Sequence, residues 1–275
     1  MDEQQLSESV LVNDTVAMSN LAAFVADNRQ HLPPTPKPVD YPALAKAIAE
    51  SDAATEAGRE ARNAAAAHRA LAREESERQG RLANLIRQAG HRYADCTLAT
   101  FKATSDKQRR AAEGVVAYCD MLRDAWESSS LILFGPVGTG KDHLAIAVAR
   151  ILIEDLGKRV EWLNGQDWFG RVRDAMDSNR PEADLIRVYA TPDVLVLSDP
   201  VPPVGSLTQH QSTMLYRLID ARYSRGVPTI CTVNVKDSAE ADERLGAATW
   251  DRLCHGAWTI HCNWPSYRKP AREIR

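Results

Sequence analysis

The chain has 275 residues and a formal net charge of −3, enough for one large domain with an appended segment. This charge argues against a globally basic nucleic-acid-binding protein, so any such contact has to come from a local patch or from an oligomer. The five cysteines show no zinc-site spacing, and no apolar run approaches the roughly 18 residues of a membrane span. We expect a soluble, cytoplasmic protein with reduced thiols, without zinc and without a membrane contact.

The first ninety residues predict an extension rather than a core. Residues 1–40 are mostly polar and end in a proline-rich stretch, which indicates a flexible tail and a stiff linker. Residues 41–90 are rich in Ala, Glu and Arg and favour a helix, although large apolar side chains are scarce between Ile48 and Leu71. This helix is either a solvated spacer or a partner-binding element whose ends dock onto another surface.

From residue 91 onward, apolar runs alternate with helical patterns. Helices are expected near residues 106–125, 143–157, 167–176, 182–189 and 208–223, and strands at residues 131–134, 159–163, 194–197, 229–233 and 258–262. Continuous apolar strands separated by helices predict an α/β fold, with a parallel sheet covered by helices on both faces. Ligands of such sheets bind at the carboxyl ends of the strands.

A phosphate-binding loop follows the first of these strands. It reads Gly135-Pro136-Val137-Gly138-Thr139-Gly140-Lys141-Asp142, and His143 opens the apolar pattern of the next helix. In a strand–loop–helix context the glycines let backbone N–H groups surround a phosphate, and the lysine reaches the outer phosphates. ATP is therefore the expected ligand. We expect His143 to pack beneath the loop without a chemical role.

Two positions depart from the usual pattern of ATP-hydrolysing proteins. The loop has Asp142 where a Ser or Thr hydroxyl ordinarily ligates Mg²⁺, and the strand 194–197 is followed by Ser198 where a carboxylate ordinarily does so. We hypothesise that Asp142 and Ser198 jointly hold Mg²⁺ with their roles exchanged, while Asp199 polarises the attacking water. The alternative is decay of the site, because an unneutralised Asp142 repels triphosphate. Nucleotide binding is better supported than hydrolysis.

Several segments in a fixed order carry a family resemblance. They are Arg92 to Phe101, Gly135 to Ala145, Tyr216 to Tyr223, Thr232-Val233-Asn234, Asp251-Arg252-Leu253 and Asn263 to Arg268. Together they resemble the DnaC/IstB family of AAA+ ATPases over roughly residues 90–270. The resemblance implies a P-loop AAA+ fold of the ASCE type with a three-layer parallel sheet. We accordingly divide the chain into a tail (1–40), a helical partner-binding extension (41–90) and an AAA+ ATPase domain (91–275).

The resemblance also implies roles for individual residues. By position, Lys141 contacts phosphate, Asn234 is the first sensor, Arg252 is the arginine finger offered to a neighbouring subunit, and Arg268 is the second sensor. A finger acting in trans requires a homo-oligomer. Arg268, with Lys269, Arg272 and Arg275 behind it, could instead touch DNA phosphate.

Three functions remain open. The first is a loader that binds single-stranded DNA and delivers a hexameric replicative helicase in DNA replication, with weak ATPase activity. The second is an IstB-like transposition helper, for which a shorter helical N-terminus and a more basic chain would be expected. The third is a hydrolysis-deficient, nucleotide-gated binding module, suggested by Asp142 and Ser198.

Overall fold

The computed structural model describes residues 40–126 and 129–268. The predicted tail and its proline-rich linker lie outside these residues. The chain divides into two compact units, Met1–Arg69 and Ala70–Arg275, and the division falls within helix α2 (Tyr41–Ala89). The domain boundaries at residues 40 and 90 stay a prediction. Within the described part of the first unit every residue except Gly58 is exposed, which agrees with the scarcity of apolar side chains there.

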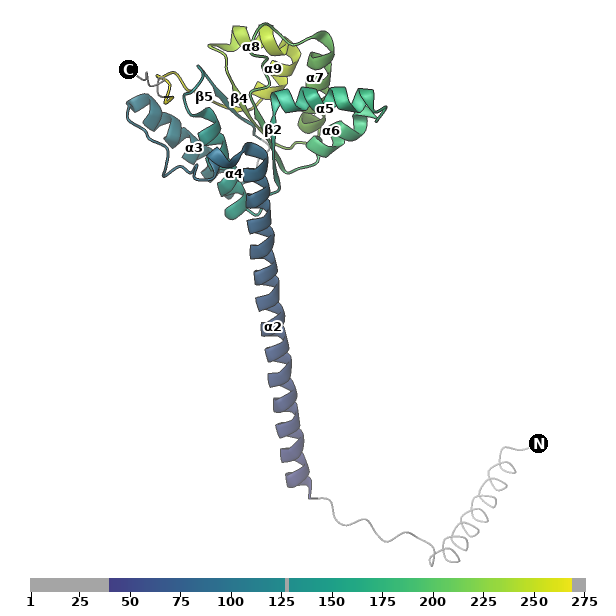
Figure 1. Cartoon of the computed structure of the whole chain (residues 1–275). Coiled ribbons are helices and arrows are strands. Elements are labelled where there is room, and N and C mark those ends of the chain that lie inside the picture. Colours follow the sequence, from purple (N-terminus) through teal and green to yellow (C-terminus); the bar gives the residue numbers. More distant parts are fainter. Residues whose placement is uncertain (1–39, 127–128, 269–275) are drawn as a thin grey trace, which may run out of the picture. The chain divides into compact units, whose positions relative to one another are not determined.

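The second unit contains a parallel sheet (Figure 1). Its strands are β1 (Leu131–Phe134), β2 (Val160–Asn164), β3 (Val194–Ser198), β4 (Thr229–Val233) and β5 (Trp258–His261). Their order is β2-β3-β4-β1-β5, and every neighbouring pair is parallel. The predicted α/β fold is confirmed, and each predicted strand agrees with an observed one to within one residue at either end.

Helices cover both faces of this sheet. They are α3 (Asp106–Asp124), α4 (Lys141–Glu154), α5 (Gly165–Asp177), α6 (Glu182–Ala190), α7 (Gln209–Ser224), α8 (Ser238–Leu245) and α9 (Ala247–Cys254). Successive side chains of a strand point to opposite faces, so Leu131 and Leu133 join a core with α3 and α4, whereas Ile132 joins a core with α5 to α9. The three-layer arrangement predicted from the apolar strands is therefore present.

Two short helices were not predicted. Helices α8 and α9 have eight residues each, and α8 buries only Ala241 and Leu245. So few apolar positions leave little helical periodicity to detect. The Asp237 side chain caps α8 by accepting a hydrogen bond from the backbone N–H of Glu240 at 2.9 Å. In the described part of the chain, no helix is both long enough and apolar enough to cross a membrane.

The C-terminal end of α2 belongs to the second unit and packs beside strand β2. Leu85 is completely buried in the core shared with α3 and α4. The side-chain carbonyl of Gln88 accepts the backbone N–H of Trp162 at 2.9 Å, and the Arg81 guanidinium donates to the carbonyl of Gly157. The end of α2 therefore covers an edge strand whose free backbone groups would otherwise face solvent.

Arg222 is a buried cation that joins three elements of the second unit. It is 1% exposed, and its guanidinium donates to the carbonyl oxygens of Tyr189 at 3.0 Å and Pro228 at 2.5 Å and to the hydroxyl of Thr229 at 3.0 Å. Burial lowers the pKa of Arg222 to about 9, which leaves the group charged at neutral pH. Arg222 belongs to the Tyr216 to Tyr223 segment that resembles the family, and these contacts give it a structural role in the domain.

Candidate nucleotide and metal site

The loop between β1 and α4 forms one wall of a cavity of about 1020 Å³. Gly138 and Gly140 have φ values of 78° and 86°, a left-handed conformation that glycine adopts without strain. Residues 137–143 line the cavity, whereas Gly135 and Pro136 do not. The predicted loop is thus placed at the carboxyl edge of the sheet, where a ligand is expected.

Lys141 is buried at the start of α4, with 6% of its surface exposed. Its ammonium group donates to the carbonyl oxygens of Gly135 at 2.8 Å and Pro136 at 2.7 Å. Burial lowers the pKa of Lys141. A positive charge held in this partly desolvated position attracts an anion more strongly than one in open water.

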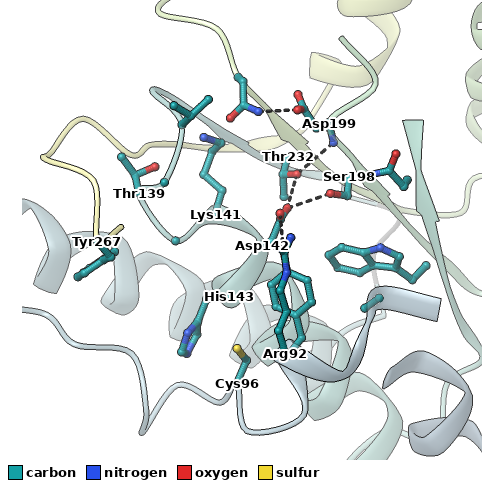
Figure 2. Close-up of a pocket in the computed structure, with 18 of the residues that line it drawn as sticks. Arg92, Cys96, Thr139, Lys141, Asp142, His143, Ser198, Asp199, Thr232 and Tyr267 are labelled. Atoms are coloured by element: carbon teal, nitrogen blue, oxygen red, sulfur yellow. Dashed lines mark hydrogen bonds between the residues drawn. The ribbon is translucent and has the colours of Figure 1, made fainter. Parts of the chain in front are cut away.

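Asp142 lies at the centre of a group of hydroxyl side chains (Figure 2). Its Oδ1 atom accepts hydrogen bonds from the hydroxyls of Ser198 at 3.0 Å and Thr232 at 2.7 Å. Its Oδ2 atom accepts a hydrogen bond from the hydroxyl of Tyr93 at 3.0 Å. The structure therefore brings Asp142 and Ser198 together, and it adds Tyr93 and Thr232, to which the motif analysis assigned no role.

Asp199 follows β3 and faces the same cavity. Its φ of 48° is unusual for a residue other than glycine, and its Oδ2 atom accepts the side-chain N–H of Asn234 at 2.5 Å. Its Oδ1 atom is buried without a hydrogen-bond partner among the described residues. Burial, opposed by the hydrogen bonds from Asn234, raises the pKa of Asp199. An unpartnered carboxylate oxygen in a polar cavity is costly unless a ligand or a cation satisfies it.

The donor set suits Mg²⁺. The side chains of Asp142, Ser198, Thr232 and Asp199 offer only oxygen atoms to this part of the cavity, and the buried Oδ1 atom of Asp199 has no hydrogen bond that a ligand would have to break. Within residues 40–126 and 129–268 no cluster of three or more His, Cys, Asp or Glu side chains could hold a metal alone. Mg²⁺ is usually held by one or two carboxylates together with phosphate oxygens.

The segment after β5 is bound to the phosphate-binding loop. The indole N–H of Trp264 donates to the carbonyl of Thr139 at 2.9 Å, and the backbone N–H of Tyr267 donates to the carbonyl of Gly138 at 2.9 Å. A Cβ atom on Gly138 would lie 2.0 Å from the hydroxyl of Ser266. This segment brings Arg268 to the cavity wall, where its predicted role as a sensor requires it to be.

His143 packs against the segment that enters the domain before α3. One ring nitrogen lies 2.8 Å from the carbonyl oxygen of Thr97, and the ring makes an edge contact with Phe101 at 5.5 Å between centroids. These contacts fix the chain that enters the domain against α4. The ring also lines the cavity, so His143 can contact a nucleotide.

Arg252 is not at this cavity. It lies in the last turn of α9 and lines a separate hollow of about 410 Å³. Its guanidinium pairs with Asp220 and lies over the rings of Tyr216 and Tyr223, at 5.0 and 5.3 Å from their centroids. Of the four residues predicted as catalytic, the structure therefore brings together Asp199, Asn234 and Arg268 but not Arg252.

A family model described as IstB-like ATP binding protein matches residues 36–274 of the chain. The chain belongs to this family. This places it within the DnaC/IstB-like AAA+ proteins, as the motifs predicted, and membership supports nucleotide binding at the loop.

Curated relatives of this IstB-like protein fall into two groups. A Sinorhizobium fredii insertion-sequence protein named for ATP binding is 32% identical over 53% of this chain and 49% of its own length. The corresponding IS21 protein of Pseudomonas aeruginosa is 32% identical over 51% of this chain and 53% of its own. The IstB-like chain thus spans about half the length of these two relatives. The replicative helicase loader DnaC of Escherichia coli K12 is 26% identical over 73% of this chain and 81% of its own length.

Solved structures show the same fold. The crystal structure of the DnaC helicase loader aligns with a TM-score of 0.57 at 24% identity, over 62% of this chain and 99% of that one. The structure of DnaI aligns with a TM-score of 0.53 at 16% identity, over 65% of this chain and 94% of that one. At these identities the similarity establishes the architecture alone.

Proposed function

We propose that this IstB-like protein is an ATP-dependent loader that binds single-stranded DNA and delivers a hexameric replicative helicase. The observation that carries the proposal is the extent of the similarity to the E. coli loader, which covers 73% of this chain and 81% of the relative. The insertion-sequence relatives match over only about half of either chain. A long α2 whose described N-terminal part is solvent-exposed offers a surface for the partner.

The nucleotide step uses the residues that surround Asp142. Lys141 contacts the outer phosphates, Asp142 and Ser198 hold Mg²⁺ with exchanged roles, and Asp199 accepts a hydrogen bond from the attacking water. Magnesium, when bound, neutralises charge on the phosphates. Asn234, which already donates to Asp199, orients that carboxylate towards the water. A low turnover suffices for such a protein, because a switch needs few cycles.

The position of Arg252 supports a homo-oligomer. Because this residue lies away from the cavity of its own subunit, a role at the phosphates requires a second copy of the chain. The ion pair with Asp220 and the two tyrosine rings hold its guanidinium in a fixed position. A fixed cation loses less conformational entropy on meeting a phosphate than a free side chain does.

The test is assembly with the helicase. The full-length protein, ATP, Mg²⁺ and the replicative helicase of the same host are mixed, and the mass of the complex is measured. Two truncations are compared, one that removes residues 1–39 and one that removes residues 1–69, which spares the part of α2 that packs on the sheet. We expect a complex that survives the shorter truncation and is lost with the longer one. Absence of any complex at micromolar concentrations contradicts the proposal.

A transposition helper is the second candidate, favoured by the 32% identity to the insertion-sequence relatives. It predicts ATP-dependent binding to duplex DNA and to a transposase, with no complex with the helicase. The same protein sample, titrated with duplex and single-stranded DNA, separates the two functions. The third function, a nucleotide-gated binding module, predicts that the protein binds ATP but does not hydrolyse it, whether the helicase or DNA is present.

A further inference from the structure

We propose that the Tyr93 hydroxyl competes with the metal for Asp142 and thereby couples metal–nucleotide binding to the end of α2. The inference rests on the proposed role of Asp142 as a magnesium ligand. Tyr93 ends the 3₁₀ turn His91–Tyr93, which follows α2 after Gly90. Its hydroxyl donates to Asp142 Oδ2 at 3.0 Å across 49 residues of sequence.

The carboxylate of Asp142 has little free capacity in this arrangement. A carboxylate accepts about four hydrogen bonds, and three hydroxyls already donate to this one. Ser198 and Thr232 lie on adjacent central strands, are 3% and 1% exposed, and cannot withdraw without disturbing the sheet. Tyr93 is half-buried on a turn, so it is the donor that can leave.

A metal ion and the Tyr93 hydroxyl cannot share Oδ2 equally. The Tyr93 phenol is a neutral hydrogen-bond donor at pH 7. A cation at Oδ2 repels the hydroxyl proton, and a neutral phenol is a poor ligand for Mg²⁺. The Arg92 guanidinium donates to the Tyr93 oxygen at 2.6 Å, and this bond can persist while the half-buried hydroxyl turns its proton to water.

Release of Tyr93 is transmitted to α2 through a short path. The Tyr93 ring lies 5.9 Å from the ring of Trp162, and the backbone N–H of Trp162 is the group that Gln88 of α2 accepts. Gly90, with φ of 106°, links the turn to the helix and allows a change of backbone direction that other residues would resist. When metal and nucleotide are bound, the contacts that Tyr93 and Trp162 make with residues 81–89 of α2 are therefore weaker.

The test uses the full-length protein and Tyr93→Phe, which removes the hydroxyl and keeps the ring. Mn²⁺ serves as a spectroscopic substitute for Mg²⁺, and its binding is titrated by electron paramagnetic resonance with a non-hydrolysable ATP analogue. Removal of a competing hydrogen bond to a charged group tightens metal binding, and we expect about tenfold. The matched control is Tyr118→Phe, which removes a hydroxyl that donates to the carbonyl of Ser129 at 2.9 Å, away from the cavity and from Asp142. It should leave metal affinity unchanged.

Hydrogen exchange of residues 81–89 is the second readout. In the wild type, we expect analogue with Mn²⁺ to accelerate exchange several-fold relative to analogue with EDTA, and Tyr93→Phe to exchange at the faster rate in both conditions. Unchanged or weaker metal binding by Tyr93→Phe overturns the competition, and exchange insensitive to metal overturns the coupling to α2. A wild type that binds nucleotide equally well with metal or EDTA overturns the proposed metal role of Asp142 as well.

Discussion

At position 142 a carboxylate stands where P-loops usually place a magnesium-binding hydroxyl. The geometry puts this carboxylate 3.0 Å from the hydroxyl of Ser198, which itself stands where a carboxylate is usual. A contact between the two atypical residues means that changes at one position have consequences for the other. A double substitution of Asp142 and Ser198 therefore distinguishes the two hypotheses, exchanged metal-binding roles and decay of the site, by its effect on binding of Mg²⁺–ATP.

The first prediction concerns this pair. Asp142→Ser and Ser198→Asp should each weaken binding of Mg²⁺–ATP by about tenfold or more, because each leaves the wrong number of carboxylates around the metal. The double variant should return to within about threefold of the wild type, since it restores one hydroxyl and one carboxylate in the usual places. Binding is measured with a fluorescent ATP analogue. Tighter binding by Asp142→Ser alone would indicate decay.

The second prediction concerns Asp199, a buried carboxylate with one unpartnered oxygen. Asp199→Asn should raise the free energy of unfolding at pH 7.5 by about 1 kcal/mol, because it removes a desolvated charge at a positive φ that Asn tolerates well. It should also lower ATP turnover at least about a hundredfold. Thermal unfolding and turnover are measured on the same samples.

The increase in the free energy of unfolding expected for Asp199→Asn should depend on pH in a definite direction. The pKa of Asp199 is raised in the folded protein, so the folded wild type takes up a proton before the unfolded chain does as the pH falls. Its ionised form costs stability above that raised pKa, and the cost disappears below the ordinary aspartate pKa. The advantage of Asp199→Asn over the wild type should therefore shrink in acid. An advantage that grows on acidification would contradict the assignment.

At the scale of elements, α2 contains two kinds of helix in one continuous segment. Leu85 is completely buried against the sheet, whereas Leu71, fourteen residues earlier on the same helix, is 67% exposed. The apolar positions near the C-terminal end thus hold the helix to the second unit, and the preceding turns gain no comparable burial. The pattern predicted a helix throughout but did not indicate which end belongs to the core.

The third prediction uses this matched pair of leucines. Leu85→Ala should lower the free energy of unfolding by about 2–4 kcal/mol, because it leaves a cavity in the core shared with α3 and α4. Leu71→Ala should change it by less than about 0.5 kcal/mol. Chemical denaturation of the full-length protein measures both. Equal effects would mean that the end of α2 is not part of the second unit's core.

The centre of the sheet was predictable because β1 and most of β3 are continuous apolar runs. Leu131 to Phe134 and Val194 to Leu197 can only be buried strands in an alternating α/β pattern. The loop residues and Ser198 were found because their positions follow from the ends of these strands. The contacts of Tyr93 and Thr232 with Asp142 join residues 49 and 90 positions apart, and no local pattern marks such pairs.

At the scale of the whole molecule, an active site that takes a residue from a second subunit can be detected by mixing two inactive variants. The fourth prediction is that Lys141→Ala and Arg252→Ala are each almost inactive as ATPases, whereas an equal mixture regains activity. In a random mixture about a quarter of the sites pair an intact nucleotide cavity with an intact arginine from the neighbour. Turnover near that fraction of the wild type is expected. No recovery, despite confirmed mixing, would place Arg252 outside the reaction.

The bond between the end of β5 and the phosphate-binding loop makes the C-terminal residues part of the nucleotide wall. Trp264 and Tyr267 hold the loop carbonyls from outside, and Ser266 lies where any side chain at position 138 would have to go. The glycine at position 138 is therefore required by a segment more than a hundred residues away, as well as by the phosphate. A side chain at position 138 would therefore displace the segment that carries Arg268 as well as the loop itself.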